Sequence, residues 1–141
     1  MVVSDHSPCT PDLKTLTPNV TLMSAWGGIL SLQFCLPLMW TEARRRGFTL
    51  QDVLRLCSVA PSKLAGLNDR KSRIKKGYDA DFVIWDPHAT LTITEDIILY
   101  KNKLSPYMNR TLAGVVKTTI VGGKIVYDNG IVSEKPLGKL I

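Results

Sequence analysis

The sequence predicts an α/β fold in two parts, with helical signals in its first half and strand signals in its second half. Residues 29–46 are apolar on nearly all sides, which is typical of a buried helix. Residues 115–121 and 124–127 carry strand signals, and Gly122-Gly123 between them is a typical two-residue hairpin turn. This order suits the last βα unit of a TIM-type (β/α)8 barrel followed by part of a β-sandwich.

The first residues predict a strand end and a long loop. Residues 1–4 contain Val2 and Val3 and resemble the last residues of a buried strand. Residues 5–21 contain three prolines and many hydroxyl side chains, which are typical of a loop. Because a loop of this length is uncommon in a compact domain unless it is functional, this segment is a candidate site.

The helical half contains recognisable start and stop signals. Pro37 is expected to kink or divide the helix of residues 29–46, which Gly47 ends. Thr49 and Asp52 have approximately the spacing of a capping box and begin the next helix. Pro61 fits the first turn of a short helix.

The best candidate for a domain boundary is the polar and basic stretch of residues 68–77. We therefore expect residues 1–67 to form the end of the barrel and residues 68–141 to form the β-sandwich portion. Further strand signals occupy residues 81–86, 90–94 and 131–132.

The net charge of +6 raises the question of a nucleic-acid partner. The basic residues form no long tract: three arginines end a predicted helix, where the helix dipole favours them, and others lie in residues 68–77. The sequence has no zinc-finger spacing, no RNP-like motif and no alternation of aromatic and basic residues. We therefore expect no nucleic-acid binding.

The three cysteines, Cys9, Cys35 and Cys57, have no metal-binding spacing. Their odd number, without a secretory signal at the start of the chain, predicts an intracellular, reducing compartment. We expect a cytoplasmic protein, with the peroxisome and the mitochondrion as alternatives. The apolar run of residues 29–40 is interrupted by Gln33 and Pro37 and is too short for a membrane span, so no membrane association is expected.

Asp5 is the candidate catalytic residue because it follows a predicted strand and opens the long loop. In an α/β barrel this position faces the mouth of the active site. A carboxylate there can bind a metal ion or accept a proton from water. The alternative is an ordinary turn or capping residue.

Two stretches form a more specific pattern: Ser4-Asp5-His6-Ser7-Pro8 and, further along, Trp26-Gly27-Gly28-Ile29. Together they resemble the amidohydrolase superfamily, in the group that opens cyclic amides and includes allantoinase, dihydropyrimidinase (hydantoinase) and dihydroorotase. Cys9 stands where dihydroorotases carry a substrate-binding histidine, which weakens that assignment. Stretches similar to allantoinases in particular are residues 25–29, 31–34, 36–41, 77–87 and 101–107.

The resemblance implies roles for four residues. Asp5 would bind one metal ion of a two-zinc centre and act as the general base and acid. Trp26, Gly27 and Gly28 would hold the ring of a small cyclic ureide substrate, because glycine allows the backbone to approach a ligand closely. The alternative for both glycines is a turn that leads into the helix.

The family pattern also requires a His-x-His pair, a carboxylated lysine and two further histidines, whereas this chain has only His6 and His88. The resemblance therefore implies an incomplete enzyme: a piece of an allantoinase or of a related cyclic-amide hydrolase, or a non-catalytic truncated product. A single strand cannot close a barrel, so we expect low stability unless a partner supplies the rest. The complete enzyme is a candidate homo-oligomer.

Overall fold

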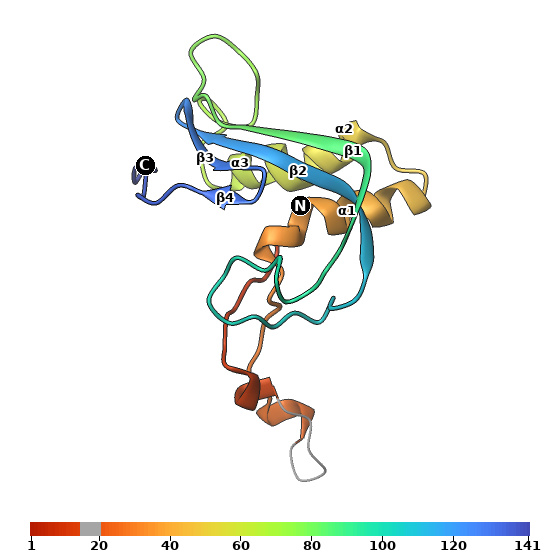
Figure 1. Ribbon diagram of the computed structural model, residues 1–141. Helices are drawn as coiled ribbons and strands as arrows, with labels where there is room; N and C mark the ends of the chain where they lie inside the picture. Colours follow the sequence, from red (N-terminus) through yellow and green to blue (C-terminus); the bar gives the residue numbers. More distant parts are fainter. Residues whose placement is uncertain (15–20) are drawn as a thin grey trace.

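In the computed structural model, which describes residues 1–14 and 21–141, an antiparallel sheet and three helices form a body from which a long arm projects (Figure 1). The strands pair in the order β1-β2-β3-β4. The helices are α1 (Cys35–Arg45), α2 (Leu50–Leu54) and α3 (Ala60–Leu64), and the strands are β1 (Phe82–Thr92), β2 (Thr111–Val121), β3 (Lys124–Asp128) and β4 (Ile131–Val132). The fold is thus mixed α/β with an antiparallel sheet.

The hairpin that the sequence predicts at Gly122-Gly123 is confirmed. Val121 pairs with Lys124, and the two glycines have φ angles of 55° and 77°. Positive φ at both central residues gives the turn a twist that matches that of the flanking strands, and glycine adopts this conformation without strain.

Strand β1 is continuous where the sequence suggested two strands. Its register with β2 shifts between Asp86 and Thr90. Within this irregularity the Asp86 carboxylate accepts hydrogen bonds from the backbone N–H groups of His88 (2.8 Å) and Ala89 (3.1 Å), which hold its pKa below the usual range. Pro87 has no N–H and is tolerated at such a bulge.

The predicted start of the first helix is wrong. A 3-10 turn at Leu32–Phe34 precedes α1, which begins at Cys35. Pro37 therefore lies in the first turn, where backbone N–H groups have no acceptor within the helix, and it neither kinks nor divides α1.

The capping box of α2 is confirmed, because Thr49 and Asp52 exchange the two expected side-chain to backbone bonds. The helices α2 and α3 are not separate, however. A π-helical turn at Arg55–Val59 joins them into one helical run. Since Pro61 has no N–H and its ring crowds the preceding turn, the wider π-helical spacing before it relieves the clash.

Residues 1–4, which the sequence predicted to end a strand, form no strand in the structure. The N–H of Val2 donates instead to the carbonyl of Leu56 (2.9 Å), and Val3 is 62% exposed. A barrel strand pairs with neighbours on both sides, and the described part of the chain places no such neighbour here.

The hydrophobic core lies between α1, the sheet and the loop that follows β1. Phe34, Ile93, Ile98 and Leu112 form its buried cluster. These residues come from both sides of residues 68–77, so the two halves share one core, and the boundary proposed there stays a prediction. No helix in the described ranges is long and apolar enough to cross a bilayer.

The contact between α1 and β2 is a close one. Above β2, the ring of Trp40 from α1 meets the ring of Trp85 from the neighbouring strand β1 edge to face, with centroids 5.5 Å apart. Gly114 lies beneath them with φ +95°, and a Cβ at this position would come within 2.8 Å of the Trp85 ring and 3.1 Å of the Trp40 ring. This position therefore requires glycine for two reasons: the backbone has a positive φ, and there is no room for a Cβ.

An ionic cluster fastens residues 68–81 to the β2–β3 turn. Arg70 binds the Asp79 carboxylate with two hydrogen bonds (2.9 and 3.2 Å), and the Lys71 ammonium bridges Asp79 and Asp81. Asp81 also accepts from the N–H of Gly122 (2.7 Å). The bonds to Lys71 lower the pKa of both aspartates, and the same bonds raise the pKa of Lys71.

We expect Gly114→Ala to destabilise the chain by about 2–4 kcal/mol, because it adds both a steric clash and backbone strain. Urea unfolding, followed by the fluorescence of Trp40 and Trp85, measures this. Gly138→Ala is the matched control, since a Cβ at Gly138 meets nothing within 4 Å. Equal unfolding midpoints for the two variants would contradict the packing argument.

The ionic cluster predicts a pH-dependent effect of Asp81→Asn. A carboxylate with a lowered pKa stabilises the fold above its unfolded pKa of roughly 4 and stops doing so as the pH falls through the lower folded value. Asp81→Asn should therefore lower the urea midpoint at pH 7 but make little difference near pH 2. Asp69→Asn, at an exposed carboxylate of the same segment, is the control. A deficit of equal size at both pH values would rule out this origin.

Candidate functional site

The arm consists of two chain segments that run side by side, residues 4–14 and 21–31 (Figure 1). The N–H of Ile29 donates to the Asp5 carbonyl (2.7 Å), and the N–H of Trp26 donates to the Leu13 carbonyl (2.9 Å). At the base, the Ser31 hydroxyl donates to the carbonyl of Ser4 (3.1 Å). These bonds bring together the two segments that the sequence analysis singled out.

Gly28 lies in the closest contact between the two segments. Its φ is +85°, and an added Cβ would stand 2.3 Å from the Ser7 Cβ and 3.0 Å from the Asp5 carbonyl oxygen. The Trp26 indole N–H donates to the Ser7 hydroxyl (2.9 Å) and ties the segments together a second time. Gly28 thus has a structural requirement that is independent of any ligand.

Asp5 is held by its backbone, while its carboxylate is exposed. Its φ of 48° is in the left-handed region, which aspartate and asparagine tolerate better than most residues. Among the described residues, the carboxylate makes no hydrogen bond or ion pair. A fixed backbone with an uncommitted carboxylate is suited to act on a ligand or on an ion supplied from elsewhere.

Trp26 and Gly27 lie on the outside of the arm. Trp26 is 50% exposed, and a Cβ at Gly27 would meet nothing within 4 Å. Within the described part of the chain, the N–H and C=O of Gly27 have no hydrogen-bond partner. Unlike Gly28, Gly27 is therefore not required by the packing of the described residues, and its backbone N–H and C=O are free to bind a ligand.

The structure adds polar residues that the sequence analysis did not assign to the site. The Lys14 ammonium donates to the carbonyls of Trp26 (2.7 Å) and Gly28 (2.8 Å). His6 accepts at Nδ1 from the N–H of Leu32 (3.3 Å), and its ring meets that of Tyr100 edge to face. Nothing in the sequence distinguishes Lys14 from a surface lysine, because its partners are backbone atoms.

The described residues do not by themselves form a metal centre. They contain no group of three or more histidine, cysteine, aspartate or glutamate side chains that could hold an ion together. Asp5 offers one carboxylate, and its neighbour His6 already uses Nδ1 for the N–H of Leu32. The two-metal site that the resemblance implies therefore does not fit the side chains present here.

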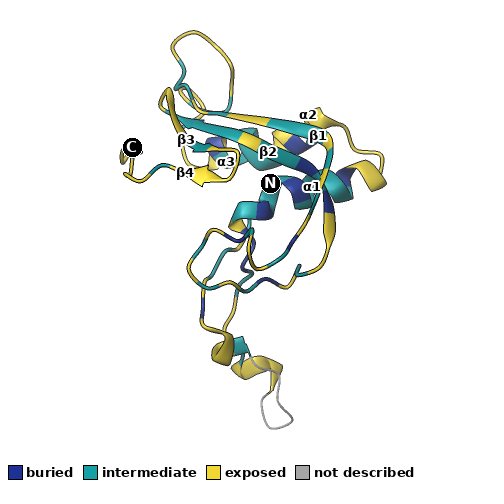
Figure 2. Ribbon diagram, in the orientation of Figure 1, coloured by how far each residue is buried: buried dark blue, intermediate teal, exposed yellow. Residues whose placement is uncertain are grey.

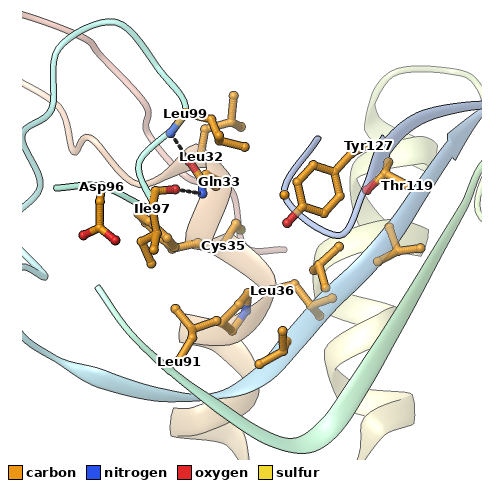
Figure 3. A pocket seen from close by; sticks show the side chains of 16 residues that line it. Leu32, Gln33, Cys35, Leu36, Leu91, Asp96, Ile97, Leu99, Thr119 and Tyr127 are labelled. Atoms are coloured by element: carbon orange, nitrogen blue, oxygen red, sulfur yellow. Dashed lines mark hydrogen bonds between the residues drawn. The ribbon is translucent and has the colours of Figure 1, made fainter. Parts of the chain in front are cut away.

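An apolar groove of about 640 Å³ lies between the start of α1, the loop of residues 96–99 and the sheet (Figure 3). The Gln33 amide on its wall donates to the Ile97 carbonyl and accepts from the N–H of Leu99, both at 2.8 Å. Tyr127 lies on the opposite wall (Figure 3). None of the four predicted site residues lines the groove, so it offers apolar contact area separate from the candidate site.

Several allantoinases are similar to this chain along almost its full length. It is 44% identical to the allantoinase of Streptomyces avermitilis and 42% identical to that of Saccharomyces cerevisiae, in each case over 99% of the chain. The chain spans only 30% of the length of either relative.

Solved structures show the same fold. The D-hydantoinase (dihydropyrimidinase) from Thermus sp. matches 96% of this chain with a TM-score of 0.84 and 28% identity, and the match covers 30% of that protein. The L-hydantoinase from Arthrobacter aurescens matches 79% with a TM-score of 0.73 and 27% identity, covering 25% of its chain. The family model of the amidohydrolases matches residues 12–126, and this chain therefore belongs to the amidohydrolase family.

Proposed function

We propose that this chain is the carboxyl-terminal part of an enzyme that hydrolyses the five-membered ring of allantoin to allantoate. The observation that carries the proposal is the uncommitted Asp5 carboxylate, whose backbone is bonded directly to the segment that contains Trp26, Gly27 and Gly28. The similarity to allantoinases over 99% of the chain supports allantoin as the substrate.

The reaction adds water across a ring C–N bond, so a proton must leave the water and another must reach the nitrogen that departs. Asp5 is suited to both tasks in turn, first as a general base and then as a general acid. Gly27 offers one N–H and one C=O, which match the acceptor and donor on the edge of a cyclic ureide. A glycine at this position lets the ring approach the backbone.

The complete enzyme would bind zinc, with Asp5 as one ligand and the remaining ligands outside these residues. Bound zinc would lower the pKa of water and polarise the ring carbonyl. In the same proposal, residues 1–67 complete a (β/α)8 barrel and residues 68–141 complete a β-sandwich. The apolar groove and exposed residues such as Val3 and Leu32 are consistent with a chain that packs against further structure.

A related hydantoinase activity is the second candidate, because the Thermus D-hydantoinase has a TM-score of 0.84 with this chain. The two activities differ in the substituent of the ring. A direct comparison of substrates separates them.

A hybrid enzyme tests the proposal. In it, these 141 residues replace the corresponding stretch of the Streptomyces avermitilis allantoinase. The hybrid should hydrolyse allantoin with a higher kcat/KM than hydantoin or dihydroorotate. Turnover of hydantoin in preference to allantoin would support the second candidate instead, and a folded, zinc-loaded hybrid without any turnover would contradict both.

Asp5→Asn in this hybrid should lower kcat/KM for allantoin by about 100-fold or more, because the general base and acid is lost. Asparagine tolerates the φ of 48°, so the backbone should remain unchanged. Asp12→Asn, at an exposed carboxylate of the same arm, is the control. Equal activity of the two variants would remove Asp5 from the mechanism.

The two glycines should respond differently in the same hybrid. Gly27→Ala keeps the backbone N–H and C=O but adds a Cβ, which meets nothing in the described structure and would hold the ring away from them. It should therefore leave the fold intact but raise KM about tenfold, the equivalent of one lost hydrogen bond of about 1.4 kcal/mol. Gly28→Ala should disturb the arm itself, because its Cβ would overlap Ser7. Steady-state kinetics and the near-ultraviolet circular dichroism of Trp26 distinguish the two effects. A normal spectrum for Gly28→Ala would show that the contact with Ser7 is absent.

A further inference from the structure

Lys14 occupies an unusual position for a lysine in an exposed arm. Its ammonium donates to two backbone carbonyls of the opposite segment, those of Trp26 (2.7 Å) and Gly28 (2.8 Å). The residue is partly buried and ends the 3-10 turn Pro11–Lys14. A lysine on an open surface points its ammonium into water, whereas this one replaces two water contacts with fixed acceptors.

The two acceptors flank Gly27. Because the carbonyls on either side converge on a single ammonium, the peptide groups around Gly27 are fixed in orientation. The N–H and C=O of Gly27 are left without a partner in the described ranges. An exposed backbone donor and acceptor are the types of group that a cyclic amide, with its own donor and acceptor, can bind.

We propose that Lys14 is a positioning residue that holds the Trp26–Gly28 backbone in the conformation that binds the substrate ring. The inference rests on the proposed function for its substrate, but its structural part is independent of that function. Lys14 acts through backbone carbonyls and does not itself contact the reacting atoms.

Other contacts of the arm do not replace this one. The Ile29 to Asp5 bond already orients the Gly28–Ile29 peptide, and the Trp26 to Leu13 bond orients the peptide before Trp26. Among the described residues, only Lys14 bonds to the peptide between them that carries the N–H of Gly27. An ammonium has three donors, so it can bind both carbonyls at once. A neutral side chain of similar length, such as methionine, can bind neither.

The test uses the hybrid enzyme with Lys14→Met, the conservative variant Lys14→Arg and the control Lys63→Met. Lys63 is an exposed lysine of α3, far from the arm in sequence. Two quantities are measured: KM and kcat for allantoin, and the rate of deuterium exchange at the amides of Trp26 and Ile29. Both amides are hydrogen-bonded across the arm and so report directly on its order.

If Lys14 positions the segment, Lys14→Met speeds exchange at both amides and raises KM about tenfold, while kcat changes less than threefold. Lys14→Arg, which keeps the charge and several donors, retains a KM within about threefold of the parent hybrid. The control matches the parent hybrid in all measurements.

Unchanged exchange in Lys14→Met would overturn the inference, and so would faster exchange with an unchanged KM. A parent hybrid that does not hydrolyse allantoin would refute the proposed function instead. In that case the exchange rates still decide whether Lys14 orders the segment.

Discussion

The packing of α1 against β2 is the interaction on which the rest of the structure depends. The Thr41 hydroxyl accepts the N–H of Ala113 on β2 (2.8 Å). On the neighbouring strand β1, the Pro87 carbonyl accepts from the Trp40 indole (2.9 Å), next to the contact of the two tryptophan rings. Without this packing contact, α1 and the sheet would each expose an apolar face to water. Because the helix and the strand come from opposite halves of the chain, neither half is complete by itself. Gly114 sets the distance at which they meet.

Much of the secondary structure could be predicted where a few neighbouring residues decide it. The capping box of Thr49 and Asp52 and the Gly122-Gly123 turn depend only on local backbone geometry, and both are present. The prediction failed where distant residues decide the conformation. Residues 29–34 have the apolar pattern of a buried helix, yet two of their backbone groups bond to distant side chains: the N–H of Leu32 donates to His6, and the carbonyl of Leu30 accepts from Tyr100. Apolar periodicity cannot detect such competition.

The candidate site was predictable to a similar extent. The resemblance pointed to Asp5 and to the Trp26–Gly28 segment, and the structure joins them through the Ile29 to Asp5 bond. The resemblance gave the two glycines the same role. The space around each shows that a side chain would clash at Gly28 but not at Gly27. Lys14 could not be predicted, because its ammonium binds backbone carbonyls 12 and 14 residues away. Every residue has a backbone carbonyl, so the types of side chain do not reveal such a contact.

The arm and the body are stabilised by different kinds of interaction. Figure 2 shows buried residues concentrated in the body, whereas the arm is mostly exposed. With little apolar area to bury, the arm depends on hydrogen bonds that contribute only about 1 kcal/mol each, so its order requires several of them together. Its base is firmer, because Leu30 and Phe34 are almost fully buried and the Tyr100 hydroxyl donates to the Leu30 carbonyl (3.0 Å). The groups suited to chemistry therefore lie on a segment that is fixed at its base and held further out by polar contacts. The two hydrogen bonds of the Lys14 ammonium are a larger share of the stabilising contacts in this arm than they would be in a packed core.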